Sequence, residues 1–172
     1  MRVGAAIVDM TPRPGLAMSG FAARTDPAIG THDRLSARAL VVGDTALVVV
    51  DVLGIDAACS ERIRTRCCLP ASNVVVAALH THGAPDAMPG RIGVDVDADF
   101  LAGLETACVA AIERAREAVA AARATERRHH RQGDALDQRR TDTRAAIDTW
   151  SRRAREAGDD ATALHCLQRR HD

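Results

Sequence analysis

Two histidines, His80 and His82, stand one residue apart directly after the apolar run at residues 74–79. On extended backbone, residues i and i+2 point to the same side, so both imidazoles can reach one metal ion or one substrate group. A Gly-Ala-Pro turn follows and exposes the two rings. The pattern is typical of a metal-binding or catalytic site, and it fits equally well two loop histidines that bond to the backbone.

A third histidine, His32, lies in the segment THDRL just before an apolar run and is the best further partner for the pair. A lone loop histidine is more often structural than a ligand, so both interpretations stay open. Asp51 ends an apolar run, where it is either a site carboxylate or a turn residue. Arg24, Arg34 and Arg38 flank His32, where they would clamp an anion or pair with neighbouring aspartates.

The cysteines are five in number and form no CxxC pair, which argues against a disulfide framework and a zinc finger. None has a histidine and a glycine turn beside it, as a nucleophile would. We therefore expect reduced packing residues at Cys59, Cys67, Cys68, Cys108 and Cys166.

The elements that must position these residues form a predicted α/β fold with a mixed sheet and flanking helices. Runs rich in β-branched residues predict strands at residues 2–10, 35–42, 45–52 and 74–79. The Gly43-Asp44 pair predicts a hairpin between the second and third strands. The fourth run is continuously apolar, which predicts a strand covered on both faces of the sheet. The edge where it ends is where open α/β sheets usually bind ligands.

Two helices are predicted from apolar residues that recur at helical spacing. Asp56 can cap the first, at residues 57–68, and Asp97 or Asp99 can cap the second, from residue 100 to about residue 124. Residues 1–122 thus form one α/β domain. The segment 123–172 differs, because it holds twelve of the 23 arginines and few aliphatic residues. It is either a helical or disordered native tail or, as we hypothesise, a frameshifted one.

Composition narrows the class of protein. The 23 basic and 23 acidic side chains cancel, so no overall field attracts nucleic acid, and no nucleic-acid partner is expected. No apolar run approaches the ~20 residues of a membrane span. The opening MRVGAAIVDM has no signal-peptide pattern, which predicts a cytoplasmic protein.

Four segments in order resemble the amino-terminal part of the catalytic domain of the neutral/alkaline, non-lysosomal ceramidase family. They are GAAIVDMTPRPGLAMSGFAAR, THDRLSARALVV, ALVVVDVLGID and NVVVAALHTHGAPD, and the resemblance covers about residues 3–122. It implies an α/β zinc-dependent amide hydrolase of sphingolipid metabolism that cleaves the N-acyl bond of ceramide. The implied substrate is a small amide or a lipid.

The family motif THTHSGP places a zinc ligand at its first histidine and a substrate-side residue at its second. By position, His80 resembles the zinc ligand and His82 the substrate-side histidine, and His32 matches a histidine of the segment GxHDxLxAR near the site. Bound zinc would polarise the amide carbonyl and lower the pKa of a water molecule. This sequence has Leu79 in place of the threonine, and Gly83 in place of the serine.

The family completes its zinc site with a histidine, a glutamate and a tyrosine from much later in a longer chain, and this sequence contains no tyrosine. The resemblance therefore implies an incomplete catalytic domain, weak or inactive alone. The alternatives are a non-catalytic remnant or interaction module whose Arg-rich tail binds an acidic partner, and a small metal-binding protein that uses the three histidines. Missing strands would leave a sheet edge uncovered, which invites self-association.

Overall fold

A computed structural model describes residues 2–18, 20–21, 23–92 and 95–168. The chain divides into two compact units, Met1–Arg123 and Ala124–Asp172. Helix α2, Ala98–Gln168, begins in the first unit and supplies every described residue of the second. The apolar stripe predicts an end near residue 124, whereas the helix continues well beyond it.

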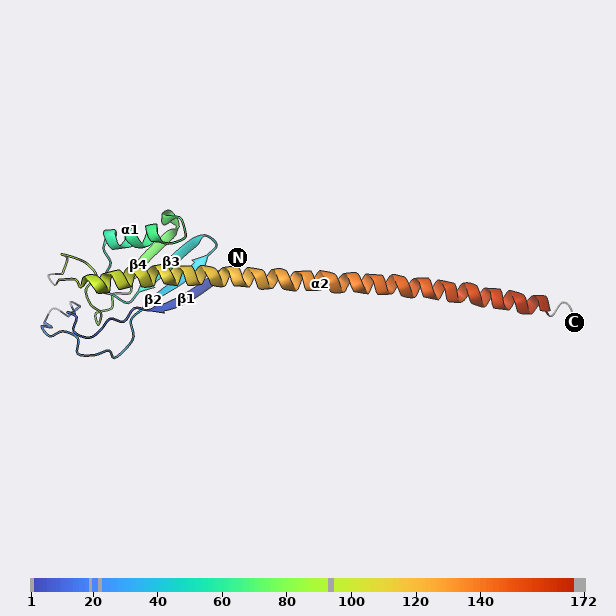
Figure 1. The fold of residues 1–172 in the computed structure, drawn as a ribbon, viewed down its shortest axis with the longest axis horizontal. Helices are drawn as coiled ribbons and strands as arrows, with labels where there is room; N and C mark the ends of the chain where they lie inside the picture. The colour runs from blue at the N-terminus through green and yellow to red at the C-terminus, as the bar shows by residue number, and fades with distance from the viewer. Residues whose placement is uncertain (1, 19, 22, 93–94, 169–172) are drawn as a thin grey trace. The chain divides into compact units, whose positions relative to one another are not determined.

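The first unit is built on a mixed four-stranded sheet, which confirms the predicted α/β fold (Figure 1). Its strands are β1 (Val3–Asp9), β2 (Ser36–Val42), β3 (Thr45–Val50) and β4 (Val74–Ala78), in that spatial order. The pairs β1–β2 and β2–β3 are antiparallel, and β3–β4 is parallel. Between β2 and β3, Gly43 has a φ of 62°, which glycine adopts without strain and a hairpin turn requires.

Helix α1, Ala57–Arg66, forms the crossover between β3 and β4 together with the short 3-10 helix η1, Ala71–Asn73. The Asp56 carboxylate accepts a hydrogen bond from the Cys59 amide at 2.6 Å, and Asp97 accepts one from the Phe100 amide at 2.8 Å. Both predicted caps are therefore confirmed at the starts of α1 and α2. Among the described residues, no helix combines the length and the apolar character needed to cross a bilayer.

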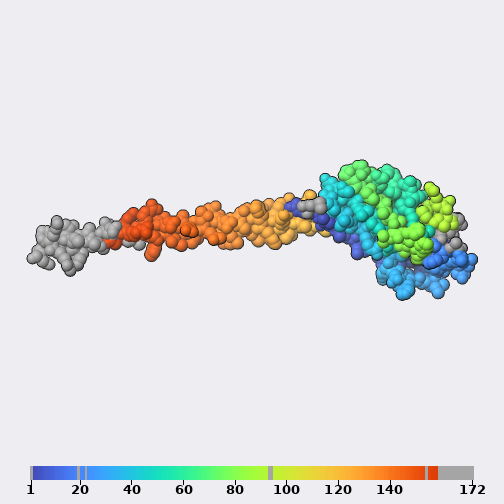
Figure 2. All heavy atoms as spheres, turned by 180° about the vertical axis from the view of Figure 1, so that it is seen from behind, coloured from blue at the N-terminus to red at the C-terminus, as the bar shows by residue number. Residues whose placement is uncertain are grey.

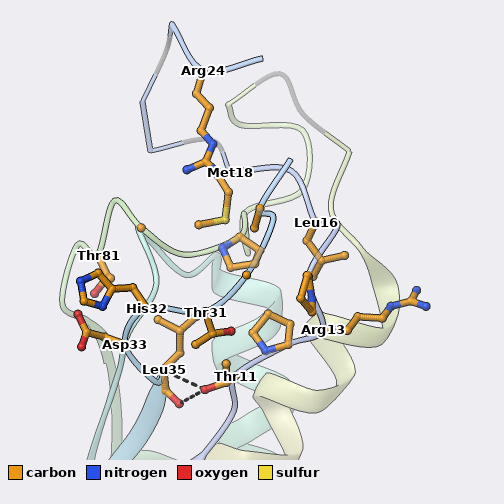
Figure 3. Close-up of a pocket in the computed structure, with 16 residues that line it drawn as sticks. Thr11, Arg13, Leu16, Met18, Arg24, Thr31, His32, Asp33, Leu35 and Thr81 are labelled. Carbon is orange, nitrogen blue, oxygen red and sulfur yellow. Dashed lines mark hydrogen bonds between the residues drawn. The ribbon is translucent and has the colours of Figure 1, made fainter. Parts of the chain in front are cut away.

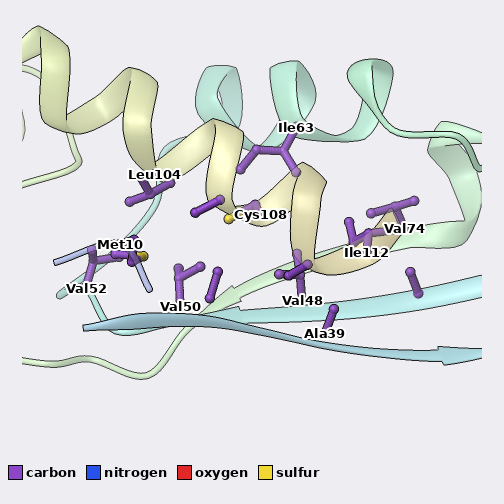
Figure 4. Packing of buried hydrophobic residues seen from close by; sticks show 14 of the residues in the cluster. Met10, Ala39, Val48, Val50, Val52, Ile63, Val74, Leu104, Cys108 and Ile112 are labelled. Carbon is purple, nitrogen blue, oxygen red and sulfur yellow. The ribbon is translucent and has the colours of Figure 1, made fainter. Parts of the chain in front are cut away.

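The core lies between the sheet and the two helices (Figure 4). Leu104, Cys108 and Ile112 of α2 are fully buried, as are Val48 of β3 and Ile63 of α1. Helix α2 passes so close to β1 that a Cβ atom at residue 4 would collide with the carbonyl oxygen of residue 115. A glycine at that position in β1 is therefore required for the layers to pack.

The opposite face of the sheet is open among the described residues, which corrects the prediction for the fourth strand. Strand β4 lies at the sheet edge and pairs only with β3. Val75 is 54% exposed and Leu79 is 55% exposed, whereas a strand covered on both faces would bury them. Leu40 and Leu47, aligned beside Val75 on β2 and β3, are also exposed. The continuously apolar strand β4 is therefore covered on one face only.

Candidate functional site

The loops that follow β1 and β4 lie at the same end of the first unit (Figure 1, Figure 2). Beyond β4, the Leu79 amide donates to the carbonyl of Val50 at 2.9 Å, and the Thr81 amide donates to the carbonyl of Val52 at 3.0 Å. The histidine loop therefore remains attached to the chain that continues from β3. The histidines therefore lie just beyond the carboxyl end of β4, which is the end of the sheet where the sequence places the site.

His80 adopts a left-handed backbone conformation, with a φ of 62°. It is the only non-glycine residue with a positive φ in the described part of the chain. Such a conformation costs of order 1–3 kcal/mol outside glycine, and residues held in it cluster at ligand and active sites. The loop is thus not simply extended between the two histidines, as the i and i+2 argument assumes.

The His80 ring is held by a backbone carbonyl. Its Nδ1 atom lies 2.9 Å from the carbonyl oxygen of Leu53. In the tautomer that carries a proton on Nδ1, the ring donates this bond and leaves the lone pair of Nε2 free. Histidine ligands of metals are commonly oriented by such a bond from the other ring nitrogen. His80 is exposed, and among the described residues no hydrogen bond occupies its Nε2 atom.

The His82 ring packs edge to face against His80, with ring centroids 4.8 Å apart and an interplanar angle of 79°. Phe21 packs against the same His82 ring, with centroids 5.5 Å apart and an interplanar angle of 64°. Gly20 lies against the His82 backbone so closely that a Cβ atom would overlap its Cα atom and carbonyl group. The structure therefore brings the predicted histidine pair together and supports it from the loop after β1.

His32 lies elsewhere, in a hollow of about 320 Å³ formed by the loops after β1 and β4. Figure 3 shows it beside Asp33 and Thr81. His80 and His82 do not line this hollow, whereas Thr81 between them does. Sequence spacing identified the three histidines but missed Thr81, because a threonine between two histidines carries no signal of its own.

The arginines near His32 are engaged with other groups. Arg24 lines the hollow and donates to the backbone carbonyls of Asp26, at 2.9 Å, and Pro27, at 3.4 Å. Arg34 forms an ion pair with Asp9. Arg38 forms an ion pair with Asp51 at 2.7 Å. The three arginines therefore do not form a joint anion clamp around His32.

Asp51 has a structural role at the start of the loop after β3. Its carboxylate accepts hydrogen bonds from the Ser36 amide at 2.9 Å, from the Ser36 hydroxyl at 3.0 Å and from Arg38 at 2.7 Å. Burial alone raises the pKa of Asp51, but the bonds from Arg38 and Ser36 outweigh it and hold that pKa below its ordinary value. The turn interpretation of this residue is the one that the contacts support.

Asp86, four residues after His82, is a buried carboxylate that the sequence did not single out. It is 3% exposed, and its Oδ1 atom accepts a hydrogen bond from the Met88 amide at 2.9 Å. Its Oδ2 atom is buried with no hydrogen-bond partner. A buried carboxylate oxygen without a partner is rare and costly, so this loop contains a hydrogen-bond acceptor that receives no donor. The only sequence signal was its place after the Gly-Ala-Pro turn.

The buried cysteines are packing residues, as predicted. Burial raises the pKa of the Cys59 thiol to about 12, and the negative charge of Glu105 adds to this shift. Burial also raises the pKa of Cys108 to about 12. Both thiols therefore stay protonated near neutral pH, and a protonated thiol is a poor nucleophile.

The described residues fit one part of a zinc site. His80 has the orientation of a ligand, with a carbonyl on one ring nitrogen and the other ring nitrogen open. However, no three His, Cys, Asp or Glu side chains of the described chain converge as metal ligands. A catalytic zinc usually has three protein ligands, so His80, His82 and His32 do not complete such a set.

No protein-family model matches the chain, and no curated protein matches it. The ceramidase resemblance therefore rests on the four sequence segments and on the residues of the site.

Proposed function

We propose that this chain is a zinc-binding, ceramidase-like amide hydrolase domain that is incomplete, and weak or inactive alone. His80 is the zinc ligand, and His82 lies on the substrate side. The observation that carries the proposal is the His80 ring, which is fixed through Nδ1 by the Leu53 carbonyl and presents Nε2 at the sheet edge. Zinc bound there would act as a Lewis acid on an amide carbonyl.

The chain's own residues would contribute positioning. Phe21 and His80 each pack edge to face with the His82 ring and so restrict its orientation toward a substrate. The neighbouring hollow, about 320 Å³ in volume, is lined by both apolar and polar side chains and suits a small amide or one end of a lipid. His32 and Thr81 would contact a substrate placed there.

A zinc titration of the purified chain tests the proposal. We expect His80→Ala to weaken zinc binding by about tenfold or more, as loss of a ligand or of its support does. His129→Ala is the matched control, because His129 is an exposed histidine of the second unit and should leave the affinity unchanged. Equal zinc affinity in the wild type and in His80→Ala would overturn the proposal. Amide hydrolysis of an N-acylated sphingoid substrate, measured in parallel, tests the reaction.

A non-catalytic remnant or interaction module is the second candidate. It is favoured by the absence of three converging metal ligands from the described residues. If zinc binds neither the wild type nor the variants, and binding of an acidic polymer falls steeply with salt and requires residues 124–172, this second function is the correct one.

A further inference from the structure

The described side chains of the second unit form a helical surface with no covering layer from that unit. Within residues 124–158, almost all described side chains are exposed, including Leu136 at 60%, Ile147 at 56% and Trp150 at 72%. A single helix in water gains little stability from its own hydrogen bonds, and most helices are stabilised by packing of an apolar stripe. The exposed apolar residues of this helix therefore need the surface of a partner to pack against.

The three large apolar residues fall at a and d positions of one heptad register, which is the spacing of a coiled coil. Leu136, Thr143 and Trp150 are seven residues apart, and Ile147 lies four residues after Thr143. In heptad terms, the first three occupy d positions, and Ile147 occupies an a position together with Gly133 and Arg140. Leu136, Thr143 and Ile147 also border one shallow groove along the helix. These positions form one face, which we call the 133–150 seam.

We propose that the 133–150 seam pairs antiparallel with the same seam of a second copy of this chain. In an antiparallel pair, a positions face d positions. Leu136 then packs on Ile147 of the second copy, and the large Trp150 packs over Gly133 of the second copy, where there is no side chain to displace. The two contacts occur twice about the two-fold axis, and they bury every large apolar residue of the seam.

The charges favour the antiparallel orientation. An antiparallel pair places e positions opposite each other, so Asp137 meets Arg144 of the second copy, and this ion pair also forms twice. Arg140 faces Thr143 across the seam, where a hydroxyl can accept a hydrogen bond. In one helix alone, Asp137 only approaches Arg140 at 3.9 Å, and such an exposed pair contributes little.

A parallel pair would bring like charges together. Its a positions face each other, so Arg140 would meet Arg140 of the second copy, and its g positions face e positions, so Arg139 would meet Arg144. Both contacts repel. The charges of the seam therefore favour the antiparallel arrangement, and they make a second copy of this chain its specific partner.

The chain contains one tryptophan and no tyrosine, so Trp150 reports on the seam directly. We expect its emission to shift to shorter wavelength as the full-length chain is concentrated, while sedimentation equilibrium shows the mass of a dimer. Leu136→Gln should weaken dimerisation about tenfold, which corresponds to 1.4 kcal/mol. Ala145→Gln, which places the same side chain at an exposed f position, is the matched control and should leave dimerisation unchanged. A chain that stays monomeric with the emission of an exposed indole at every concentration would overturn the proposal.

Charge reversal tests the orientation. In the antiparallel pair, Asp137→Arg and Arg144→Asp should each weaken dimerisation, and the double variant should restore it because the pair is rebuilt with its signs exchanged. In a parallel pair, Arg144→Asp would instead strengthen dimerisation, since it would relieve repulsion from Arg139. Strengthening by Arg144→Asp would therefore refute the antiparallel arrangement. Zinc binding by His80 is unaffected by any of these outcomes, so this proposal stands or falls separately.

Discussion

Arg62 donates from Nε to Oε1 of Glu105 at 2.7 Å and so links helix α1 to helix α2 within the first unit. Arg66 donates to the other oxygen of the same carboxylate at 3.2 Å. Glu105 is only 7% exposed. Helical periodicity alone would place this glutamate on the surface, whereas the structure buries it; Arg62 and Arg66 remain about half exposed, with side-chain exposures of 47% and 46%. The side chains meet because the two helices lie side by side on the same face of the sheet.

Replacing the carboxylate should destabilise the first unit. Glu105→Gln removes the charge that two arginines share, and we expect the free energy of unfolding to fall by about 1–3 kcal/mol. Urea denaturation followed by circular dichroism measures the change. Glu113→Gln on the same helix is the control, because Glu113 is exposed, and its effect should stay within about 0.5 kcal/mol. Equal effects of the two substitutions would contradict the paired role of Glu105.

Asp51 should make stability depend on acid pH. Its folded pKa lies below its ordinary value, because the bonds from Arg38 and Ser36 outweigh the effect of burial. The stabilisation is therefore present above the unfolded pKa, which is near 3.8, and is lost as pH falls through the folded pKa. We expect Asp51→Asn to destabilise the chain by about 1.5–3 kcal/mol at pH 7.

The pH profile separates this cause from a loss of packing. The difference in unfolding free energy between the wild type and Asp51→Asn should shrink as pH is lowered from 5 toward 2. Asp44→Asn serves as the control, because Asp44 is exposed in the hairpin turn. A difference that stays constant over this range would show that ionisation of Asp51 is not what stabilises the fold.

The strands, the first helix and both helix starts were predictable because each depends on local pattern. A β-branched run, a Gly-Asp turn or an aspartate before an apolar stripe acts within a few residues. Whether a strand is covered on both faces is not local. Val75 has the same apolar neighbours in sequence whether a second layer lies over it or not, so the prediction of two covered faces was wrong. The end of α2 was missed for a related reason.

The apolar stripe that packs α2 on the sheet ends near residue 124, but the run of helix-forming residues continues beyond it. The sequence after Pro89 contains no proline and is rich in Ala and Arg, which are strong helix formers. In the site, residue spacing located the histidine pair. It could not show the Leu53 carbonyl or the Phe21 ring, because these contacts join loops that are far apart in the chain.

The cysteines should differ sharply in reactivity. The pKa of the Cys59 thiol is raised from 9.0 to about 12, so at pH 8 its thiolate fraction, and hence its rate of alkylation, should be roughly a thousandfold below that of an ordinary thiol. Cys108 should behave alike, whereas Cys68 is exposed and should be alkylated faster than either buried thiol. Timed alkylation of the native chain, read by peptide mass spectrometry, measures this. Rapid native labelling of Cys59 would contradict it.

Gly20 should control the placement of His82. A Cβ atom at this position would overlap the Cα atom and the carbonyl group of His82, and backbone atoms cannot rotate away as a flexible side chain can. Gly20→Ala should therefore displace the loop and disturb the contact between the His82 and His80 rings. The measurement is the set of histidine ring signals in a ¹H–¹³C NMR spectrum, where we expect those of His80 and His82 to move.

Gly30→Ala is the matched control for this loop. A Cβ atom at residue 30 would meet nothing within 4 Å, so the same substitution should leave the ring signals in place. If His80 holds zinc, Gly20→Ala should also weaken zinc binding by about tenfold, as changes behind a metal ligand do. Unmoved ring signals in Gly20→Ala would mean that the loop after β1 does not support the histidine pair. If the ring signals move but zinc affinity does not change, Gly20 positions His82 only. The orientation of His80 would then depend on the Leu53 carbonyl alone.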